Sequence, residues 1–433
     1  MSYEFEEYSW YDANGRLVKV PEDSNHVYRA VSENTLRIFK ELADGEKLDL
    51  LISKGLIETE ISQIQITGYA GVLKHRKIPF VSEPNEWTMQ MHQKASLMLC
   101  QLAIELDKLG YALQDAHPWN VSFLGTQPVF FDWGSIIRRE KLSKLAWLLE
   151  FRKHTYIPLW LHSKGLQTLA YESLWERRGG SAKYFFNHPY LRIFPPSFYL
   201  LLKNCGRWDF QKILASIIRM ISKLNVGALP GFWSDYDQGS YAYKDDGFRE
   251  FLDGLPERSS ILDIGCNRGT YSIESSKAGH QVVAFDYDAR AVDELFEIAV
   301  ENCYDLTPLH IDLIRPTHSY GPDLSSPDIF ERLRCHYVLA FAISHHLAKN
   351  YRITFETLAR ILSQYSRKGV LVEYVDPKDK HLLAWQQRGW QPQPWYNEQN
   401  FIDSFSKLFR LKKTWSTKEG DEIVRRLFFF EKK

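Results

Sequence analysis

The pattern of apolar and polar positions changes along the chain. After about residue 245, short apolar runs alternate with segments in which apolar residues recur at helical spacing. The runs typical of strands are SILDIG, QVVAFD, LTPLHID, HYVLAFAI, GVLVEYV, RLKKTWS and RRLFFFE. This alternation predicts an α/β fold with a doubly wound, mostly parallel seven-stranded sheet. Only the turn STKEGDE separates the last two runs, which predicts an antiparallel hairpin at the end of the sheet.

The first 225 residues combine short strands with a long helical block. The pair Asn14-Gly15 between aromatic and apolar runs predicts a hairpin, and HVYRAV follows as a strand. Ser32 is the expected N-cap of the helix in ENTLRIFKELA. A longer helix is predicted over about 86–109, ended by Gly110. The pattern therefore predicts an α+β module with a strand-rich lobe over about 1–83 and a helical lobe over about 84–225.

A change of composition separates these two parts. The stretch GALPGFWSDYDQGSYAYKDDG concentrates Gly, Pro, Asp and Ser, which is typical of a loop. We therefore expect a linker over 226–245, between a first domain at 1–225 and a second at 246–433.

Composition narrows the class of protein. The 433 residues carry 54 Lys and Arg against 54 Asp and Glu, so the charge does not indicate a globally basic nucleic-acid binder. No run approaches the ~20 apolar residues that span a bilayer. The start, MSYEFEEYSW, lacks the basic and apolar regions of a secretory signal. Five cysteines without a CxxC pair indicate reduced thiols. We expect a cytoplasmic protein without a metal site or membrane association.

The strongest candidate chemistry begins at ILDIGCNRGTYS. An apolar strand leads into Asp263, and Gly265 and Gly269 then form a tight turn that opens into a helix. Such a turn lets backbone N–H groups approach a ligand, and the helix N-terminus adds a favourable field. Asn267 stands where a dinucleotide fingerprint has its middle glycine, which argues against a bound pyrophosphate.

Two more acids follow at the ends of the next two strands. Asp286 lies 21 residues after Gly265, where a carboxylate can bind both hydroxyls of a ribose. Asp312 ends the third strand, where a carboxylate can meet an adenine edge. These positions predict a ligand with ribose and adenine but little negative charge. S-adenosylmethionine fits, because its sulfonium and amino acid tail tolerate an acid at Asp263 that would repel a pyrophosphate.

These motifs carry a family resemblance. LDIGCNRG, FDYD and HID are similar to the glycine motif, the ribose-binding acid and the adenine-side acid of class I S-adenosylmethionine-dependent methyltransferases. The resemblance covers about 240–433 and implies a Rossmann-like sheet. It implies a cofactor site made of Asp263, Gly265, Asn267, Gly269, Asp286 and Asp312. The alternative is a NAD-type or purely structural Rossmann-like domain.

Candidates for contact with the methyl acceptor follow the fourth and fifth strands, in AFAISHHLA and VLVEYVDPKD. Both segments should meet the cleft at the carboxyl ends of the strands. His346 is the first candidate for a base or orienting group and Glu373 the second, with His345 and Asp376 beside them. The competing interpretation is that HHL only packs the acceptor loop.

A second constellation lies in the first part of the chain. Asp115 and Asn120 are five residues apart, and an apolar strand delivers Asp132 twelve residues later. Two aspartates and an asparagine can hold metal-bound phosphates and orient a hydroxyl. Their arrangement resembles the catalytic loop and metal triplet of the protein kinase and aminoglycoside phosphotransferase superfamily. Leu113 replaces the usual histidine, no GxGxxG loop is present, and Arg29 occupies a plausible place for the strand lysine. A degenerate substrate-holding or regulatory module is predicted. An active Mg-ATP-dependent phosphotransferase and chance similarity are the alternatives.

Over nearly its full length, the chain resembles a bacterial family that includes nodulation-associated (NoeA-like) methyltransferases. The resemblance implies methyl transfer from S-adenosylmethionine to an O or N atom. A small-molecule or glycan acceptor is expected, and a protein or RNA acceptor stays open. A bifunctional enzyme with ATP at the first module and a non-catalytic cofactor-binding scaffold are the alternative functions.

Overall fold

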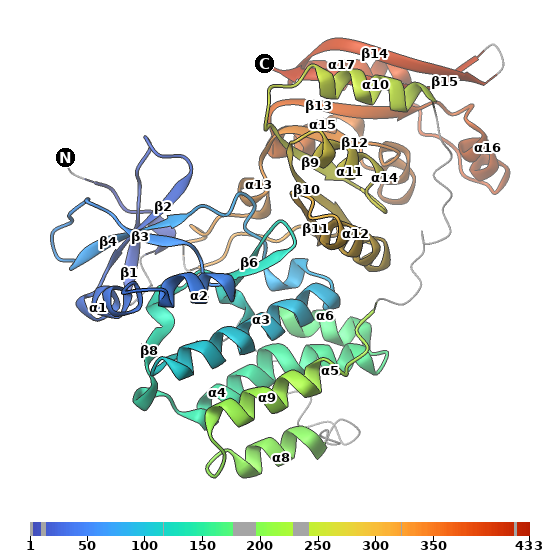
Figure 1. The fold of residues 1–433 in the computed structure, drawn as a ribbon. Helices are drawn as coiled ribbons and strands as arrows, with labels where there is room; N and C mark the ends of the chain where they lie inside the picture. The colour runs from blue at the N-terminus through green and yellow to red at the C-terminus, as the bar shows by residue number, and fades with distance from the viewer. Residues whose placement is uncertain are drawn as a thin grey trace. The chain divides into compact units, whose positions relative to one another are not determined.

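The computed structural model describes residues 3–9, 14–115, 117–175, 196–227, 242–321, 323–419 and 422–433. The chain divides into two compact units, residues 1–228 with 320–326, and residues 229–319 with 327–433 (Figure 1). Residues 228–241 of the predicted linker lie outside the described residues. Helix α10 (Ala242–Asp253) begins inside the stretch that composition assigned to that linker.

The first unit contains a small antiparallel sheet with the order β1-β2-β4-β3. Its strands are β1 (Gly15–Val18), β2 (His26–Val31), β3 (Thr59–Ile61) and β4 (Gly71–Arg76). Helix α1 (Glu33–Leu42) begins at the predicted N-cap, where the side chain of Ser32 accepts a hydrogen bond from the amide of Thr35. The predicted Asn14-Gly15 hairpin needs residues 10–13, which lie outside the described residues.

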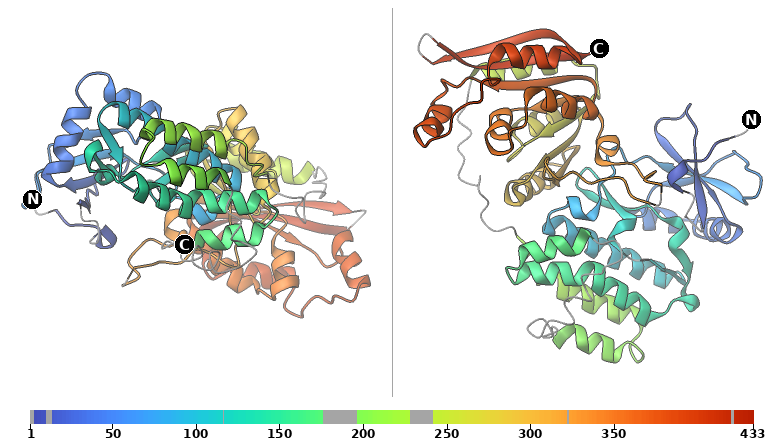
Figure 2. Two further views of the ribbon diagram at one scale, coloured as in Figure 1. Left: turned by 90° about the horizontal axis from the view of Figure 1, so that it is seen from below. Right: turned by 180° about the vertical axis from the view of Figure 1, so that it is seen from behind.

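The rest of the first unit is mainly helical. The long helix α3 (Met89–Lys108) begins later than predicted, because residues Pro84–Glu86 form a separate 3-10 turn and Thr88 is the N-cap. It packs against α9 (Phe210–Ile221), and Figure 2 shows the two helices side by side. The other helices are α2 (Lys47–Ser53), α4 (Lys144–Phe151), the π-helix η6 (Arg152–Tyr156), α5 (Ile157–Ser163), α6 (Gln167–Trp175) and α8 (Pro196–Asn204).

Two short antiparallel ladders lie in the same unit. Strand β5 (Tyr111–Leu113) pairs with β8 (Ile136–Arg138), and β6 (Val121–Leu124) pairs with β7 (Gln127–Phe130). These ladders hold the loops that carry the predicted Asp–Asn–Asp constellation.

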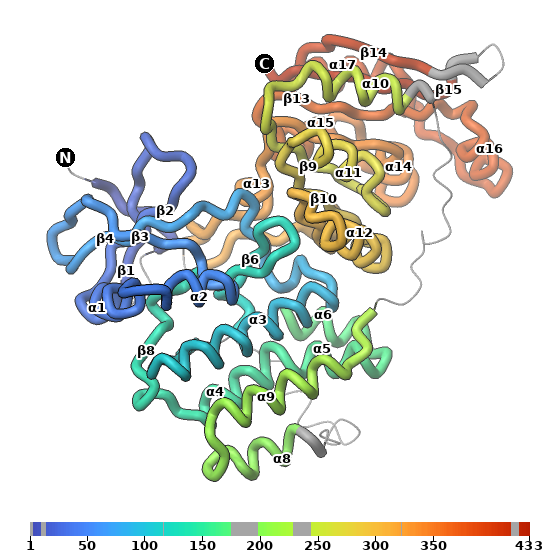
Figure 3. The backbone as a smooth tube through the Cα atoms, in the orientation of Figure 1, coloured from blue at the N-terminus to red at the C-terminus, as the bar shows by residue number. Residues whose placement is uncertain are grey.

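The second unit is built on the predicted seven-stranded sheet, with the order β11-β10-β9-β12-β13-β15-β14 (Figure 3). The first five strands in that order are parallel, and β15 runs antiparallel to both β13 and β14, which confirms the predicted terminal hairpin. The strands are β9 (Ser260–Ile264), β10 (Gln281–Asp286), β11 (Leu306–His310), β12 (Cys335–Ala340), β13 (Ser366–Val375), β14 (Phe409–Glu419) and β15 (Glu422–Lys432).

Helices connect these strands. They are α11 (Thr270–Lys277), α12 (Ala289–Glu301), α13 (Ile329–Arg332), α14 (Ser344–Tyr351), α15 (Phe355–Tyr365), α16 (Lys380–Gln387) and α17 (Glu398–Ser406). Strands β9 and β10 are buried along almost their whole length, as expected for parallel strands in the middle of a sheet. Their continuous apolar character therefore reflects cover on both faces. Within the described ranges, no helix is long and apolar enough to cross a membrane.

Candidate functional site

A cavity of about 370 Å³ opens at the carboxyl ends of the parallel strands of the second unit. Five of the six predicted cofactor residues line it, namely Asp263, Gly265, Asn267, Asp286 and Asp312. The sixth, Gly269, is not part of the lining. The topology thus brings the ends of three strands and one turn to a single concave site, as expected at the switch point of a doubly wound sheet.

The turn after β9 needs glycine for two reasons. Gly265 and Gly269 have φ angles of 73° and 75°, which favour glycine. A Cβ on Gly265 would lie 2.5 Å from a side-chain carbon of Ile343, and one on Gly269 would lie 2.3 Å from a side-chain carbon of Leu295. Gly269 is also the residue from which α11 begins. It therefore shapes the turn and the helix start, while Gly265 forms part of the cavity wall.

We expect Gly269→Ala to destabilise the second unit by roughly 2–4 kcal/mol, because left-handed backbone strain adds to overpacking against Leu295. Gly279→Ala is the matched control. Gly279 has φ 84°, but no atom lies within 4 Å of a Cβ built there, so only the backbone strain of about 1–2 kcal/mol applies. Urea denaturation measures both free energies of unfolding. Equal losses in the two variants would show that the Leu295 contact is not limiting.

Asp286 is buried at the end of β10 and holds its carboxylate toward the glycine turn. Its two oxygens accept hydrogen bonds from the amides of Asn267 and Asp288, both at 2.9 Å. A carboxylate has about four acceptor sites, so hydroxyl donors of a ligand can bind as well. Asp312 has a similar local anchor, because one of its oxygens accepts from the amide of Ile314 at 2.9 Å. Both acids are therefore fixed before a ligand arrives.

Asp263 is 3% exposed and accepts a 2.6 Å hydrogen bond from the hydroxyl of Ser272. Burial raises the pKa of Asp263 to about 7; the Ser272 hydrogen bond opposes this rise and the charge of Asp286 adds to it. The raised pKa means that the folded protein favours the protonated acid. Near neutral pH this group therefore changes charge inside the cavity.

A pH dependence follows from this group. A cationic ligand favours the ionised form of Asp263, so its Kd should fall by up to about tenfold as pH rises from 6 to 8. Stability of the ligand-free protein should change the opposite way. The contribution of Asp263 is fully present below its unfolded pKa and is lost as pH rises through about 7. Calorimetric titration with S-adenosylmethionine across this range is the measurement. Asp263→Asn should flatten the profile, and an equally steep profile in that variant would contradict the assignment.

The predicted acceptor-side residues differ in whether they line the cavity. His346 lines the cavity, whereas His345, Glu373 and Asp376 are not part of its lining. Burial, followed by the nearby Lys349, lowers the pKa of His346 to about 4, so its imidazole is neutral at physiological pH. His345, its neighbour on α14, is 2% exposed and packs on Trp385 with 5.5 Å between ring centroids. His346 is therefore the cavity-facing member of the pair.

Glu373 is fully buried and surrounded by donors. One oxygen accepts from the amide of Ala342 at 2.7 Å and lies 3.0 Å from the ammonium of Lys244, and the other lies 3.7 Å from the guanidinium of Arg425. The Glu373 carboxylate therefore holds two cations and the loop after β12. This geometry favours a structural role for Glu373 over that of a base.

Among the cavity residues that sequence reasoning missed are two basic ones, Lys244 and Arg425. Lys244 lies on α10, inside the predicted linker, and Arg425 lies on the last strand. The available signal for Arg425 was a basic residue in an otherwise apolar strand. Lys244 offered none, because loop composition surrounds it.

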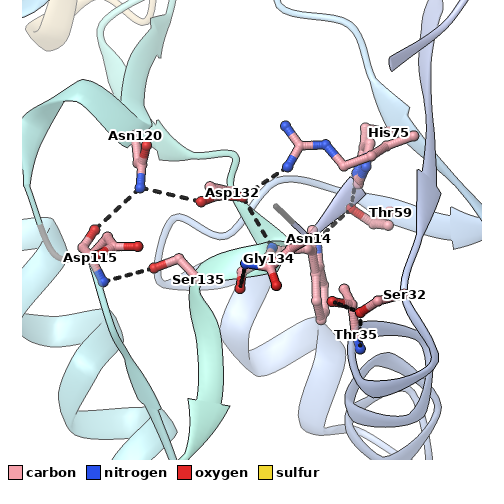
Figure 4. Close-up of polar contacts among 12 residues, drawn as sticks. Asn14, Ser32, Thr35, Thr59, His75, Asp115, Asn120, Asp132, Gly134 and Ser135 are labelled. Atoms are coloured by element: carbon pink, nitrogen blue, oxygen red, sulfur yellow. Dashed lines mark hydrogen bonds and ion pairs between the residues drawn. The ribbon is translucent and has the colours of Figure 1, made fainter. Parts of the chain in front are cut away.

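In the first unit, the structure brings the Asp–Asn–Asp constellation together (Figure 4). The side-chain amide of Asn120 donates to the backbone oxygen of Asp115 at 3.3 Å and to the carboxylate of Asp132 at 3.4 Å. Asp132 also accepts from Arg29 at 2.8 Å and from the amide of Gly134 at 3.0 Å. Burial raises the pKa of Asp115. Arg29 thus neutralises the acid that a metal ion would need.

Comparison with known proteins gives three kinds of match. Residues 235–409 match the family described as "Methyltransferase domain". The nodulation protein NoeA of Rhizobium meliloti (strain 1021) is 25% identical over 418 residues, which cover 87% of this chain and 85% of that protein.

Solved structures also match. The magnesium protoporphyrin IX methyltransferase ChlM of Synechocystis PCC 6803 is 15% identical, covering 44% of this chain and 84% of that chain with a TM-score of 0.33. The N-methyltransferase NodS of Bradyrhizobium japonicum WM9 is 11% identical, covering 44% and 96% with a TM-score of 0.32. The protein is an S-adenosylmethionine-dependent methyltransferase.

Proposed function

We propose that this S-adenosylmethionine-dependent methyltransferase transfers a methyl group to an O or N atom of a small molecule or glycan. The observation that supports the proposal is the meeting of Gly265, Asp286, Asp312 and His346 in one cavity. The first three have the chemistry to hold an adenosyl group, and the fourth is a polar side chain on another wall. A cavity with these two features can align a cofactor and an acceptor.

The residues present fit the cofactor. A Cβ on Gly265 would lie 2.5 Å from Ile343, so glycine keeps this part of the cavity wall in its conformation. The carboxylate of Asp286 would accept from the ribose hydroxyls, and that of Asp312 would meet the adenine side. S-adenosylmethionine supplies a methyl carbon already activated by the sulfonium. The protein itself must orient the acceptor and exclude water.

His346 is our candidate for contact with the acceptor. Because its imidazole is neutral and lines the cavity, one ring nitrogen can accept a hydrogen bond from an acceptor hydroxyl or amine. The low pKa makes the ring a weak base, so we propose that it orients the acceptor, whose proton then leaves to solvent water.

For the first unit, we propose a degenerate kinase-like fold that holds substrate or regulates the enzyme. The small antiparallel sheet, the long helix α3 and the Asp–Asn–Asp constellation support this proposal. The residues do not fit Mg-ATP. Arg29 lies 2.8 Å from the carboxylate of Asp132, so a cation already occupies the acid that would hold the metal ion. Separately, we propose that the protein is cytoplasmic.

Labelled cofactor tests the proposed reaction. The full-length protein is incubated with fractionated cell extracts and S-adenosylmethionine that carries a deuterated methyl group, and mass spectrometry follows the label. We expect a labelled small molecule or glycan with the wild-type protein and none with Asp286→Ala. Binding of S-adenosylhomocysteine without a labelled product in any fraction would instead support the non-catalytic scaffold.

Thermal denaturation tests the proposal for the first unit. We expect Mg-ATP to leave the Tm of the full-length protein unchanged, because the Arg29–Asp132 ion pair occupies the metal-binding carboxylate. A rise in Tm that Asp132→Asn abolishes would favour the bifunctional alternative.

A further inference from the structure

Trp385, on α16, contacts three side chains of α14 (Figure 1). The centroid of its indole ring lies 5.0 Å from that of the His346 ring and 5.5 Å from that of the His345 ring. The ammonium of Lys349 lies 4.2 Å from the centroid of the same indole. Of these four residues only His346 lines the cavity. Trp385 therefore lies behind the side chain that is our candidate for contact with the methyl acceptor.

These contacts restrict the orientation of the His346 ring. The torsion that turns an imidazole about its Cβ–Cγ bond has broad minima, so packing decides where the ring nitrogens point. The His346 ring meets the indole at an interplanar angle of 66°, which is an edge-to-face arrangement. It also lies 4.3 Å from the ring of His345, which is 2% exposed. Loss of the indole would therefore remove a contact that limits rotation of the His346 ring.

The indole also holds a cation of the same helix. Lys349 follows His346 by three positions, so the two side chains are neighbours on the surface of α14. The ammonium of Lys349 lies over the indole, where the electron-rich face of the ring attracts it. Burial, followed by the charges of Lys349, His381 and Arg425, lowers the pKa of His346. Trp385 supports the first two causes, because it packs on the His346 ring and binds Lys349.

We propose that Trp385 is a positioning residue for methyl transfer, which holds the His346 ring in the cavity wall with a ring nitrogen toward the acceptor. In this role the indole acts through His346 and not on the acceptor itself. The inference rests on the proposed function, because it requires an acceptor at His346. Two variants separate the indole from its aromatic character: Trp385→Leu removes the ring, and Trp385→Phe keeps an aromatic face against His346 and Lys349.

Nuclear magnetic resonance of histidine labelled with ¹⁵N tests the positioning without any acceptor. The full-length protein is used, and His346→Gln assigns the His346 signal. We expect Trp385→Leu to admit water to the ring and to raise the pKa of His346 from about 4 by about one unit or more. Trp385→Phe should titrate as the wild type does. The control is Trp208→Leu, because Trp208 is half-buried in the first unit and carries a similar cation, Lys212, 4.8 Å from its centroid.

Transfer of the deuterated methyl group tests the consequence. Initial rates at saturating S-adenosylmethionine and serial dilutions of the extract fraction that the wild type labels give an apparent kcat and KM. A misdirected ring slows the chemical step, so we expect Trp385→Leu to lower the apparent kcat about tenfold or more. Its Kd for S-adenosylhomocysteine should stay within twofold of the wild type. Trp385→Phe should recover at least half of the rate, and Trp208→Leu should match the wild type.

Several outcomes overturn the inference. Trp385→Leu changes neither the His346 titration nor the apparent kcat, or it changes only one of them. Trp385→Phe is as impaired as Trp385→Leu, or Trp385→Leu weakens S-adenosylhomocysteine as much as it slows transfer. If the wild type labels a product and these variants fail the test, only the role of Trp385 is lost. If the wild type labels nothing in any fraction, the proposed function fails and the inference fails with it.

Discussion

Asp286→Ala is expected to raise the Kd for S-adenosylhomocysteine by roughly 30- to 150-fold. Under the proposed function the carboxylate of Asp286 accepts from the ribose hydroxyls, so its loss would remove hydrogen bonds worth about 2–3 kcal/mol together. The same carboxylate accepts from the amides of Asn267 and Asp288. The substitution therefore also loosens the turn that carries Gly265.

Isothermal titration calorimetry measures this change on the full-length protein. Asp403→Ala is the matched control, because Asp403 is an exposed aspartate on α17 of the same unit. Its Kd should equal that of the wild type. If the Asp286→Ala variant binds S-adenosylhomocysteine as tightly as Asp403→Ala does, Asp286 does not bind the ribose.

Glu373→Ala is expected to cost about 3–5 kcal/mol of unfolding free energy. The substitution leaves the buried cations Lys244 and Arg425 without the carboxylate that lies between them. It also removes the acceptor of the amide of Ala342, whose φ of 52° places it in the left-handed region. Removing the Glu373 carboxylate should therefore also disorder part of the loop between β12 and α14.

Urea denaturation gives the free energies. Glu356→Ala is the control, since Glu356 forms an exposed ion pair with Lys407 at 3.1 Å, and such pairs contribute about 0–1 kcal/mol. Glu373→Gln separates the two causes, because the amide keeps an acceptor for Ala342 but not the charge. If Glu373→Ala lowers the free energy of unfolding no more than Glu356→Ala does, the buried contacts of Glu373 with Lys244 and Arg425 do not stabilise the fold.

Much of the second unit could be predicted from local pattern. Its central parallel strands are buried on both faces, so a strand such as β10 appears in the sequence as an uninterrupted apolar run, QVVAFD. A parallel sheet then places the residues after those runs at one edge. That rule brought Asp263, Asp286 and Asp312 together without knowledge of any contact.

Residues that depend on distant parts of the chain could not be predicted in this way. Lys244 and Arg425 belong to the first helix and the last strand of the second unit, and only the folded sheet brings both to Glu373. The rotation of a helix about its axis likewise decides which of two adjacent residues faces a cavity. His345 and His346 are equivalent in the sequence, but of the two only His346 lines the cavity.

The first unit shows the same division. The spacing of Asp115, Asn120 and Asp132 predicted a cluster, and the structure joins them through Asn120. The role of Arg29 depends on how β2 faces the loop after β7. Its ion pair with Asp132 places a cation against one acid of the cluster, which the spacing of the three residues does not reveal.

A crystal structure of the full-length protein with S-adenosylhomocysteine tests the central claim most directly. We predict the adenosyl group beside Gly265, with ribose oxygens within hydrogen-bonding distance of the Asp286 carboxylate and the adenine on the Asp312 side. Density for the ligand at any other place, or Asp286 turned away from a ribose that does bind beside Gly265, would contradict it.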